Sequence, residues 1–188
     1  IKEQQPLFNQ KLRRTRQMCS IRLQGDRPEV VYSRDIDFAH TPDLYGLFAS
    51  RHAAIEALKG MADESKLCLS LLGLEKNQGG RPCFRHMLKR CAGACCGVET
   101  AAQHNDRLKQ QLENQRIECW PYAGPIGLIE KADLRTDIHV IHNWLYLGST
   151  ASLVDAKKLS KTAATFDSDG YKILCKPILT GSLPVVEL

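Results

Sequence analysis

The stretch RPCFRHMLKRCAGACCG, residues 81–97, holds four of the eight cysteines of a 188-residue chain. Basic side chains lie between these cysteines, at Arg81, Arg85, Lys89 and Arg90. The chain is long enough to bury a core of its own, and its first residues do not resemble a signal peptide. Clustered thiols in such a chain more often bind a metal than form disulfides. The stretch therefore predicts a metal centre in basic surroundings.

The predicted metal ligands are Cys68, Cys83, Cys91 and Cys95, which are separated by 14, 7 and 3 residues. These gaps lack the paired C-x2-C knuckles of common zinc modules, whereas a [4Fe–4S] cluster is bulkier and accepts wider, irregular spacing. A cluster is thus favoured slightly over Zn²⁺, and a set of free buried thiols remains the third interpretation. Cys96 is expected to be spare, because the side chains of adjacent residues diverge.

The residues before the cysteines predict a β-hairpin followed by a helix. CSIRLQ and EVVYSR alternate in polarity, which indicates strands at Cys19–Leu23 and Glu29–Ser33. DLYGLFAS comes next and is interpreted as a glycine-broken loop. Ser50 is suited to cap a helix from Arg51 to about Glu64, with its apolar residues on one face.

The residues after the cysteines predict a polar helix and then a small β-rich segment. The helix is expected from about Thr100 to Ile117, and its narrow apolar stripe indicates that it covers a surface rather than forming a core. From Trp120 on, GPIGLIEK, IHVIHNWLYLGS and GYKILCKPIL are interpreted as β-rich runs. A short helix is expected at about residues 152–160, and FDSDG is interpreted as a turn between strands. The whole chain therefore predicts an α+β fold.

The formal net charge is +5 and the sequence pI is about 8.8, so a polyanionic partner is favoured only where the cations cluster. They cluster in two places, and both together form the predicted DNA-binding set: Lys11, Arg13, Arg14, Arg16, Arg81, Arg85, Lys89 and Arg90. No apolar run approaches the roughly 18–20 residues that span a bilayer. We therefore expect a cytoplasmic protein that binds DNA and no membrane.

The cysteine stretch resembles the UvrC excinucleases, the incision subunits of bacterial nucleotide excision repair. The family pattern of Arg-Pro-Cys, seven residues, Arg-Cys, three residues and Cys is matched from Arg81 to Cys95, with Cys68 as the upstream cysteine. IKEQQPLFN at the start is similar to the end of the family's GIY-YIG nuclease domain. CAGACCG and DGYKILCKP are similar to segments of the short, Cho-type members.

The resemblance implies that the full-length protein is an endonuclease that incises damaged double-stranded DNA on the 3′ side of the lesion, together with UvrB. It implies a divalent metal such as Mg²⁺ on a Glu of the nuclease domain, upstream of Ile1. Asn9 is the one nuclease-motif position present, in a supporting role. The chain is thus expected to be a non-catalytic, cluster-containing portion; the alternative is a stand-alone metal-binding DNA-binding module.

Four parts are expected along the chain. They are the tail of a GIY-YIG domain (1–16), a hairpin and helix linker (17–67), the cysteine cluster with the following helix (68–118), and a β-rich C-terminal domain (119–188).

Overall fold

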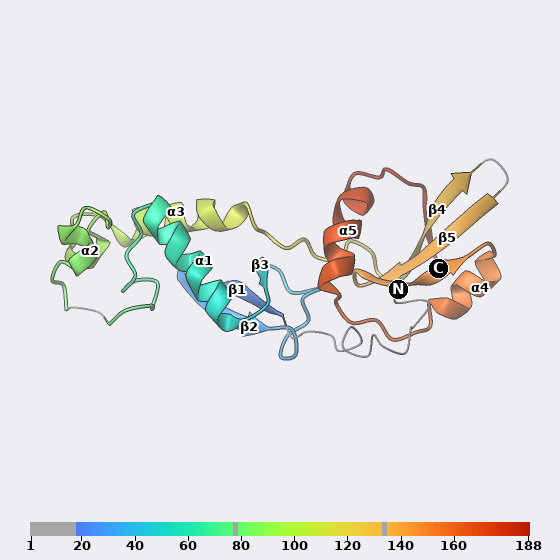
Figure 1. Ribbon diagram of the computed structural model, residues 1–188, viewed down its shortest axis with the longest axis horizontal. Helices are drawn as coiled ribbons and strands as arrows, with labels where there is room; N and C mark the ends of the chain where they lie inside the picture. The colour runs from blue at the N-terminus through green and yellow to red at the C-terminus, as the bar shows by residue number, and fades with distance from the viewer. Residues whose placement is uncertain (1–17, 77–78, 133–134) are drawn as a thin grey trace, which may run out of the picture. The chain divides into compact units, whose positions relative to one another are not determined.

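The computed structural model describes residues 18–76, 79–132 and 135–188. The chain divides into two compact units (Figure 1). Of the described residues, the N-terminal unit contains residues 18–36 and 42–117, and the C-terminal unit contains residues 37–41 and those from 118 on. The four-part division expected from the sequence stays a prediction. Asn9, Lys11, Arg13, Arg14 and Arg16 lie outside the described residues.

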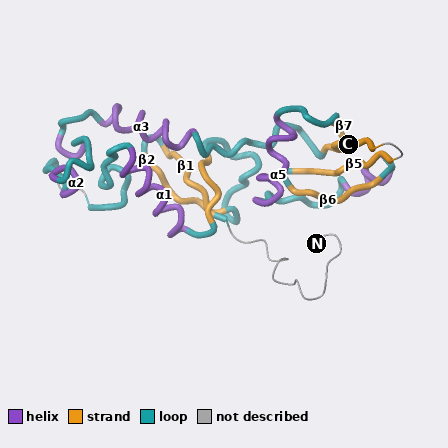
Figure 2. The backbone as a smooth tube through the Cα atoms, turned by 45° about the horizontal axis from the view of Figure 1, so that its top comes forward, coloured by secondary structure: helices purple, strands orange, loops and turns teal. Residues whose placement is uncertain are grey.

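The N-terminal unit contains a three-stranded antiparallel sheet in the order β2-β1-β3. Figure 2 shows β1 and β2 of this sheet. Strands β1 (Cys19–Gln24) and β2 (Arg27–Tyr32) form the predicted hairpin, with Gln24 paired to Arg27 across a tight turn. Gly25 in that turn has a φ of 64°, which glycine adopts without steric cost. The alternating polarity of the two segments was therefore a reliable guide to the hairpin.

The third strand corrects the prediction of a loop at DLYGLFAS. Strand β3 (Leu44–Phe48) pairs with β1, although a register shift interrupts the pairing. Gly46 has a φ of 70°, and a Cβ on it would lie 2.4 Å from the Phe48 ring. This glycine therefore does not end the strand; it lets the strand bend while the Phe48 ring packs against its backbone.

Helix α1 (Arg51–Glu64) has the predicted bounds, and the Ser50 side chain accepts a hydrogen bond from the Ala53 N–H at 3.2 Å. Helix α3 (Ala101–Glu113) begins after a capping box of Thr100 and Gln103 and ends earlier than predicted. Between them lie the short helix α2 (Phe84–Met87) and a single 3₁₀ turn, η2 (Ala94–Cys96).

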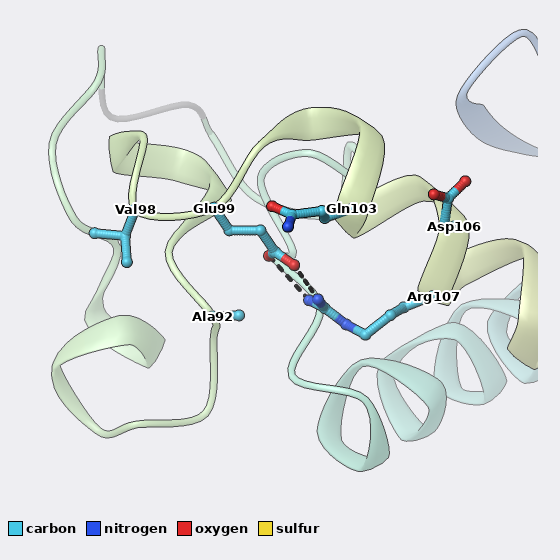
Figure 3. A pocket seen from close by; sticks show the side chains of 6 residues that line it. All are labelled: Ala92, Val98, Glu99, Gln103, Asp106 and Arg107. Atoms are coloured by element: carbon cyan, nitrogen blue, oxygen red, sulfur yellow. Dashed lines mark hydrogen bonds and ion pairs between the residues drawn. The ribbon is translucent and has the colours of Figure 1, made fainter.

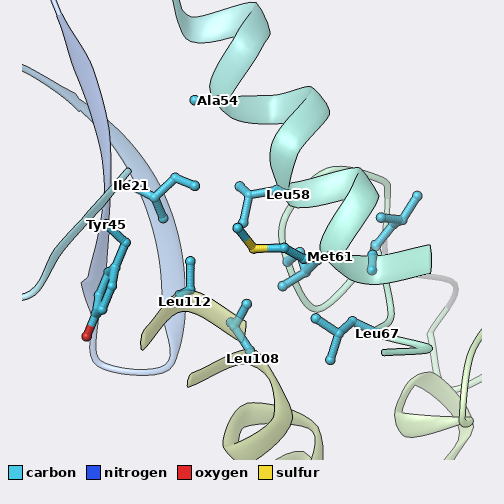
Figure 4. Packing of buried hydrophobic residues seen from close by; sticks show 11 residues of the cluster. Ile21, Tyr45, Ala54, Leu58, Met61, Leu67, Leu108 and Leu112 are labelled. Atoms are coloured by element: carbon cyan, nitrogen blue, oxygen red, sulfur yellow. The ribbon is translucent and has the colours of Figure 1, made fainter. Parts of the chain in front are cut away.

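The prediction that α3 covers a surface was wrong, because its narrow stripe enters the main core. Leu108 and Leu112 are buried against α1 and the sheet, in contact with Leu58, Met61 and Ile21 (Figure 4). His104 is one turn before Leu108 on the same stripe and is also buried. Three buried positions spaced by four residues were enough to anchor this helix in the core, although most of its other residues face solvent.

The C-terminal unit contains a four-stranded antiparallel sheet in the order β6-β5-β4-β7. Its strands confirm two of the three predicted β-rich runs and add a short one at the end of the chain: β4 (Ile126–Ala132), β5 (Arg135–His142), β6 (Leu145–Thr150) and β7 (Val185–Glu187). Helix α4 (Leu153–Leu159) confirms the predicted short helix and packs on β5 and β6.

The third predicted run, GYKILCKPIL, is a helix and not a strand. Helix α5 spans Ser168–Leu179, and the carboxylate of Asp167 accepts the Gly170 N–H at 2.9 Å. FDSDG is thus a helix cap and not a turn between strands. Trp144 packs edge-on against Trp120 and Tyr171, with ring centroids 5.1 and 5.2 Å away, and this aromatic group holds α5 in place.

Substitution of Gly170 by alanine is expected to destabilise the C-terminal unit by about 3 kcal/mol. A Cβ on Gly170 would lie 2.1 Å from the backbone oxygen of Trp144, so α5 would have to move away from the β5–β6 turn. Both tryptophans of the chain lie in this unit, so tryptophan fluorescence during urea unfolding measures the change. Gly124→Ala is the control, since a Cβ there meets no atom within 4 Å; equal midpoints for both variants would contradict the expectation.

Candidate metal centre

Four cysteine sulfurs converge at the end of the N-terminal unit where α1 finishes and α3 begins. Cys68, Cys83, Cys91 and Cys95 are all buried, and their Sγ atoms all lie within 4.8 Å of one another. Within the described ranges, no other set of three or more His, Cys, Asp or Glu side chains comes close enough to hold a metal ion. The structure therefore brings together the four cysteines that their spacing singled out.

Cys68 joins this site to the core. Its neighbours Leu67 and Leu69 are buried in the main hydrophobic cluster, while its own side chain belongs to the cysteine cluster. The Cys68 N–H donates to Nε2 of the buried His104 at 3.0 Å, and His104 Nδ1 lies 3.1 Å from Asn105 Oδ1. Because Nε2 accepts, Nδ1 carries the proton and donates to Asn105. The polar start of α3 thus fixes the backbone beside the first cysteine.

Cys83, Cys91 and Cys95 are positioned by a tight loop around α2. Cys83 precedes α2, and its N–H donates to Cys95 Sγ at 3.4 Å. The Gly93 N–H donates to Cys91 Sγ, also at 3.4 Å. Gly93 has a φ of 96°, and a Cβ there would lie 2.7 Å from Val98 Cβ, so this turn needs glycine. Backbone N–H groups directed at sulfur stabilise thiolates.

Cys96 lies outside the four-sulfur group. Its side chain is half-buried, and its Sγ donates to the Gly93 carbonyl at 3.4 Å. Cys95 and Cys96 share the turn η2, but of the two sulfurs only that of Cys95 belongs to the group. The identification of Cys95 as the fourth ligand stays a prediction, as does the ligation itself.

Burial raises the pKa of the Cys91 thiol, and the nearby Cys68 and Cys83 raise it further, while the Gly93 N–H lowers it. Four thiolates cannot share so small a buried volume without a cation, since each negative charge disfavours the others. A metal would displace the thiol protons and supply the missing positive charge. The arrangement is therefore one that could hold a metal ion.

The donor set fits both metals that the sequence predicted. A tetrahedral Zn²⁺ with Zn–S bonds of about 2.3 Å has sulfurs about 3.8 Å apart, which is compatible with the observed separations. A [4Fe–4S] cluster accepts the same four thiolates, but it is bulkier, so the sulfurs would have to move apart to hold it. The bound group would stabilise this loop, since only the cysteines and a few apolar neighbours pack inside it.

A second connection, between Glu99 and Arg107, fastens the loop to α3. Arg107 Nη2 donates to Glu99 Oε2 at 2.9 Å, and Arg107 Nε donates to the Ser65 carbonyl at 2.9 Å at the end of α1. Glu99 and Arg107 lie in a shallow pocket of about 470 Å³ beside Ala92 (Figure 3). Neither this pair nor His104 was predicted from the sequence. The spacing of four residues between His104 and Leu108 was the available signal for His104.

The cations of the cysteine loop have different surroundings. Arg81, Lys89 and Arg90 are exposed. Arg85 is mostly buried, and its Nη1 lies 2.7 Å from Asp63 Oδ1 of α1. Arg85 thus holds α2 against α1. The membership of all four cations in a DNA-binding surface stays a prediction.

Comparison with known proteins agrees with these features. Residues 18–114 match the UvrC/Cho excinuclease middle domain, and residues 125–188 match the Excinuclease Cho C-terminal domain. The chain is 54% identical to Excinuclease cho of Escherichia coli K12 and 55% identical to that of Salmonella typhi, over all 188 residues. It spans 64% of the length of both relatives.

More distant similarity extends to the larger excinuclease subunit. UvrABC system protein C of a Psychrobacter species is 28% identical over 108 residues, which is 55% of the chain and 17% of that protein. No solved structure matches the chain. The α+β unit with four converging cysteines is thus that of the excinuclease middle domain. The chain belongs to the UvrC/Cho excinuclease family, which confirms the resemblance inferred from the cysteine stretch.

Proposed function

We propose that this chain is the non-catalytic, DNA-binding portion of a DNA repair endonuclease. The observation that carries the proposal is the match to the middle and C-terminal domains of excinucleases along almost the whole described chain. The full-length protein would incise damaged double-stranded DNA on the 3′ side of the lesion, using a GIY-YIG nuclease domain with a divalent metal such as Mg²⁺. UvrB on the DNA would be its partner.

The four cysteines would hold a [4Fe–4S] cluster, which would supply structural stability to the loop. The wide, irregular spacing and the family resemblance support the cluster. A single Zn²⁺ is the second candidate, because the sulfur separations of up to 4.8 Å suit one tetrahedral ion without movement. Among the described residues, no helix is long and apolar enough to cross a membrane.

The chain alone is expected to leave lesion-bearing duplex uncut in the presence of Mg²⁺, UvrA and UvrB. The reason is that its two matched domains are the middle and C-terminal ones, so the catalytic groups would belong to another part of the protein. The assay measures nicked strands on a denaturing gel, with full-length Excinuclease cho of E. coli as the positive control. Nicking by the chain above the buffer control would overturn the non-catalytic assignment.

A further inference from the structure

Helix α2 is amphipathic, but its apolar side chains face solvent and its polar side chains face the protein. Phe84, Met87 and Leu88 fall on one face of the turn, and they are 68%, 66% and 53% exposed. The polar residues Arg85 and His86 turn inward; the Arg85 side chain is mostly buried, and His86 is half-buried. A surface helix ordinarily buries its apolar face, so an outward apolar face beside a rigid site indicates an interaction surface.

The α2 turn is held firmly, so this exposed face is fixed in place. Arg85 pairs with Asp63 at 2.7 Å and donates to the Arg90 carbonyl at 3.3 Å. His86 Nδ1 donates to the Cys91 carbonyl at 3.0 Å, directly before the Gly93 turn. The three apolar side chains thus project from a base formed by the cysteine loop. A fixed apolar face loses little conformational freedom when it binds.

The charge around the apolar face points to a polyanionic partner. Residues 76–98 contain no carboxylate and five cations, of which Arg85 is neutralised by Asp63 of α1: Lys76, Arg81, Arg85, Lys89 and Arg90. Arg81 precedes the apolar face and Lys89 and Arg90 follow it, and all three are exposed. Apolar side chains flanked by cations suit nucleic acid, where phosphates contact the cations and unstacked bases contact the apolar groups.

We propose that Phe84, Met87 and Leu88 form a wedge that contacts unstacked bases of distorted DNA while the neighbouring cations contact its phosphates. This inference rests on the proposed function, and it names the DNA feature that the cysteine loop prefers. An unpaired or damaged base is already unstacked, so the wedge gains contact there without the free-energy cost of opening a paired step. The wedge thus selects distorted over intact duplex.

The test uses the metal-loaded chain and two duplexes of equal length, one fully paired and one with a central unpaired stretch that contains 2-aminopurine. The unaltered chain is expected to bind the unpaired duplex more tightly than the paired one. In the triple variant Phe84→Ala, Met87→Ala, Leu88→Ala, the ratio of the two affinities is expected to fall by about tenfold or more, because contact with unstacked bases is lost. The slope of log affinity against log salt should be the same for the variant and the unaltered chain, because no cation is removed. The 2-aminopurine fluorescence change on binding should also disappear.

The matched control truncates three exposed apolar residues of the C-terminal unit, Val154→Ala, Ile173→Ala and Leu179→Ala, and should retain the preference. Unchanged metal content and thermal unfolding show that each variant is folded. If the α2 variant binds both duplexes with the affinities of the unaltered chain, the proposed wedge is wrong, whereas the proposed DNA-binding function is retained. If the unaltered chain binds neither duplex, the proposed DNA-binding function fails too. Loss of UvrB binding with DNA binding unchanged would assign this face to a protein partner and overturn the wedge.

Discussion

Replacement of Cys91 by serine is expected to remove the bound metal and to loosen residues 68–96. Cys91 is 3% exposed and lies with the other three sulfurs inside a loop that contains few apolar side chains. A structural site of four thiolates contributes binding free energy of the order of 10 kcal/mol to folding, so losing one ligand should melt the loop. Metal analysis and hydrogen exchange at residues 68–96 measure the two effects.

The adjacent cysteines provide the control for this substitution. Cys96→Ser should keep the metal, because Cys96 Sγ lies outside the four-sulfur group and donates to the Gly93 carbonyl. Cys95→Ser should lose it, as Cys91→Ser does. Retention of metal by Cys95→Ser together with its loss in Cys96→Ser would show that the wrong member of the pair was assigned as the fourth ligand.

The second large effect is expected on DNA affinity. The triple variant Arg81→Ser, Lys89→Ser, Arg90→Ser should weaken duplex binding by about 10²-fold at low salt, at about 1 kcal/mol per phosphate contact. The slope of log affinity against log salt should fall in magnitude by about 3, because three phosphate contacts would be lost. Arg85 is left in place, since its pairing with Asp63 holds α2 and its removal would confuse folding with binding.

A charge-matched control separates a local surface from net charge. Lys157→Ser, Lys158→Ser, Lys161→Ser removes three exposed cations from α4 and the residues after it. Fluorescence anisotropy over a range of salt concentrations gives both the affinity and the slope. Equal losses in the two variants would mean that the chain's net charge attracts DNA and that the cysteine loop has no specific surface.

Much of the cysteine site could be predicted from the sequence, because ligand spacing is a local pattern. The four converging sulfurs are the set that spacing selected, and adjacency was enough to set Cys96 apart. The supports of the site were not predicted. The hydrogen bond between Cys68 and His104 spans 36 residues, and the one between Arg107 and Ser65 spans 42. Such pairings exist only after α1 and α3 have packed, so no local pattern predicts them.

The errors in the fold also come from tertiary contacts. Glycine has a low strand propensity, which is why Gly46 predicted a loop; here it lets the Phe48 ring pack against a bent strand. The apolar run of Ile173, Leu174 and Cys175 is too short for its periodicity to distinguish a strand from a helix. The N-cap at Asp167 was the signal that favoured a helix. The outward apolar face of α2 could not be predicted either, because a helix of four residues is too short to show a periodic pattern in the sequence.

We propose that Cys68, Cys83, Cys91 and Cys95 bind one metal group that stabilises the loop carrying the proposed DNA surface. The most direct measurement is elemental analysis of the chain purified without oxygen, beside the Cys91→Ser variant. We expect four irons per chain, with broad absorption near roughly 400 nm, and background metal in the variant. One zinc per chain would replace the cluster by the second candidate. A chain that holds neither metal above the level of the variant would contradict the claim.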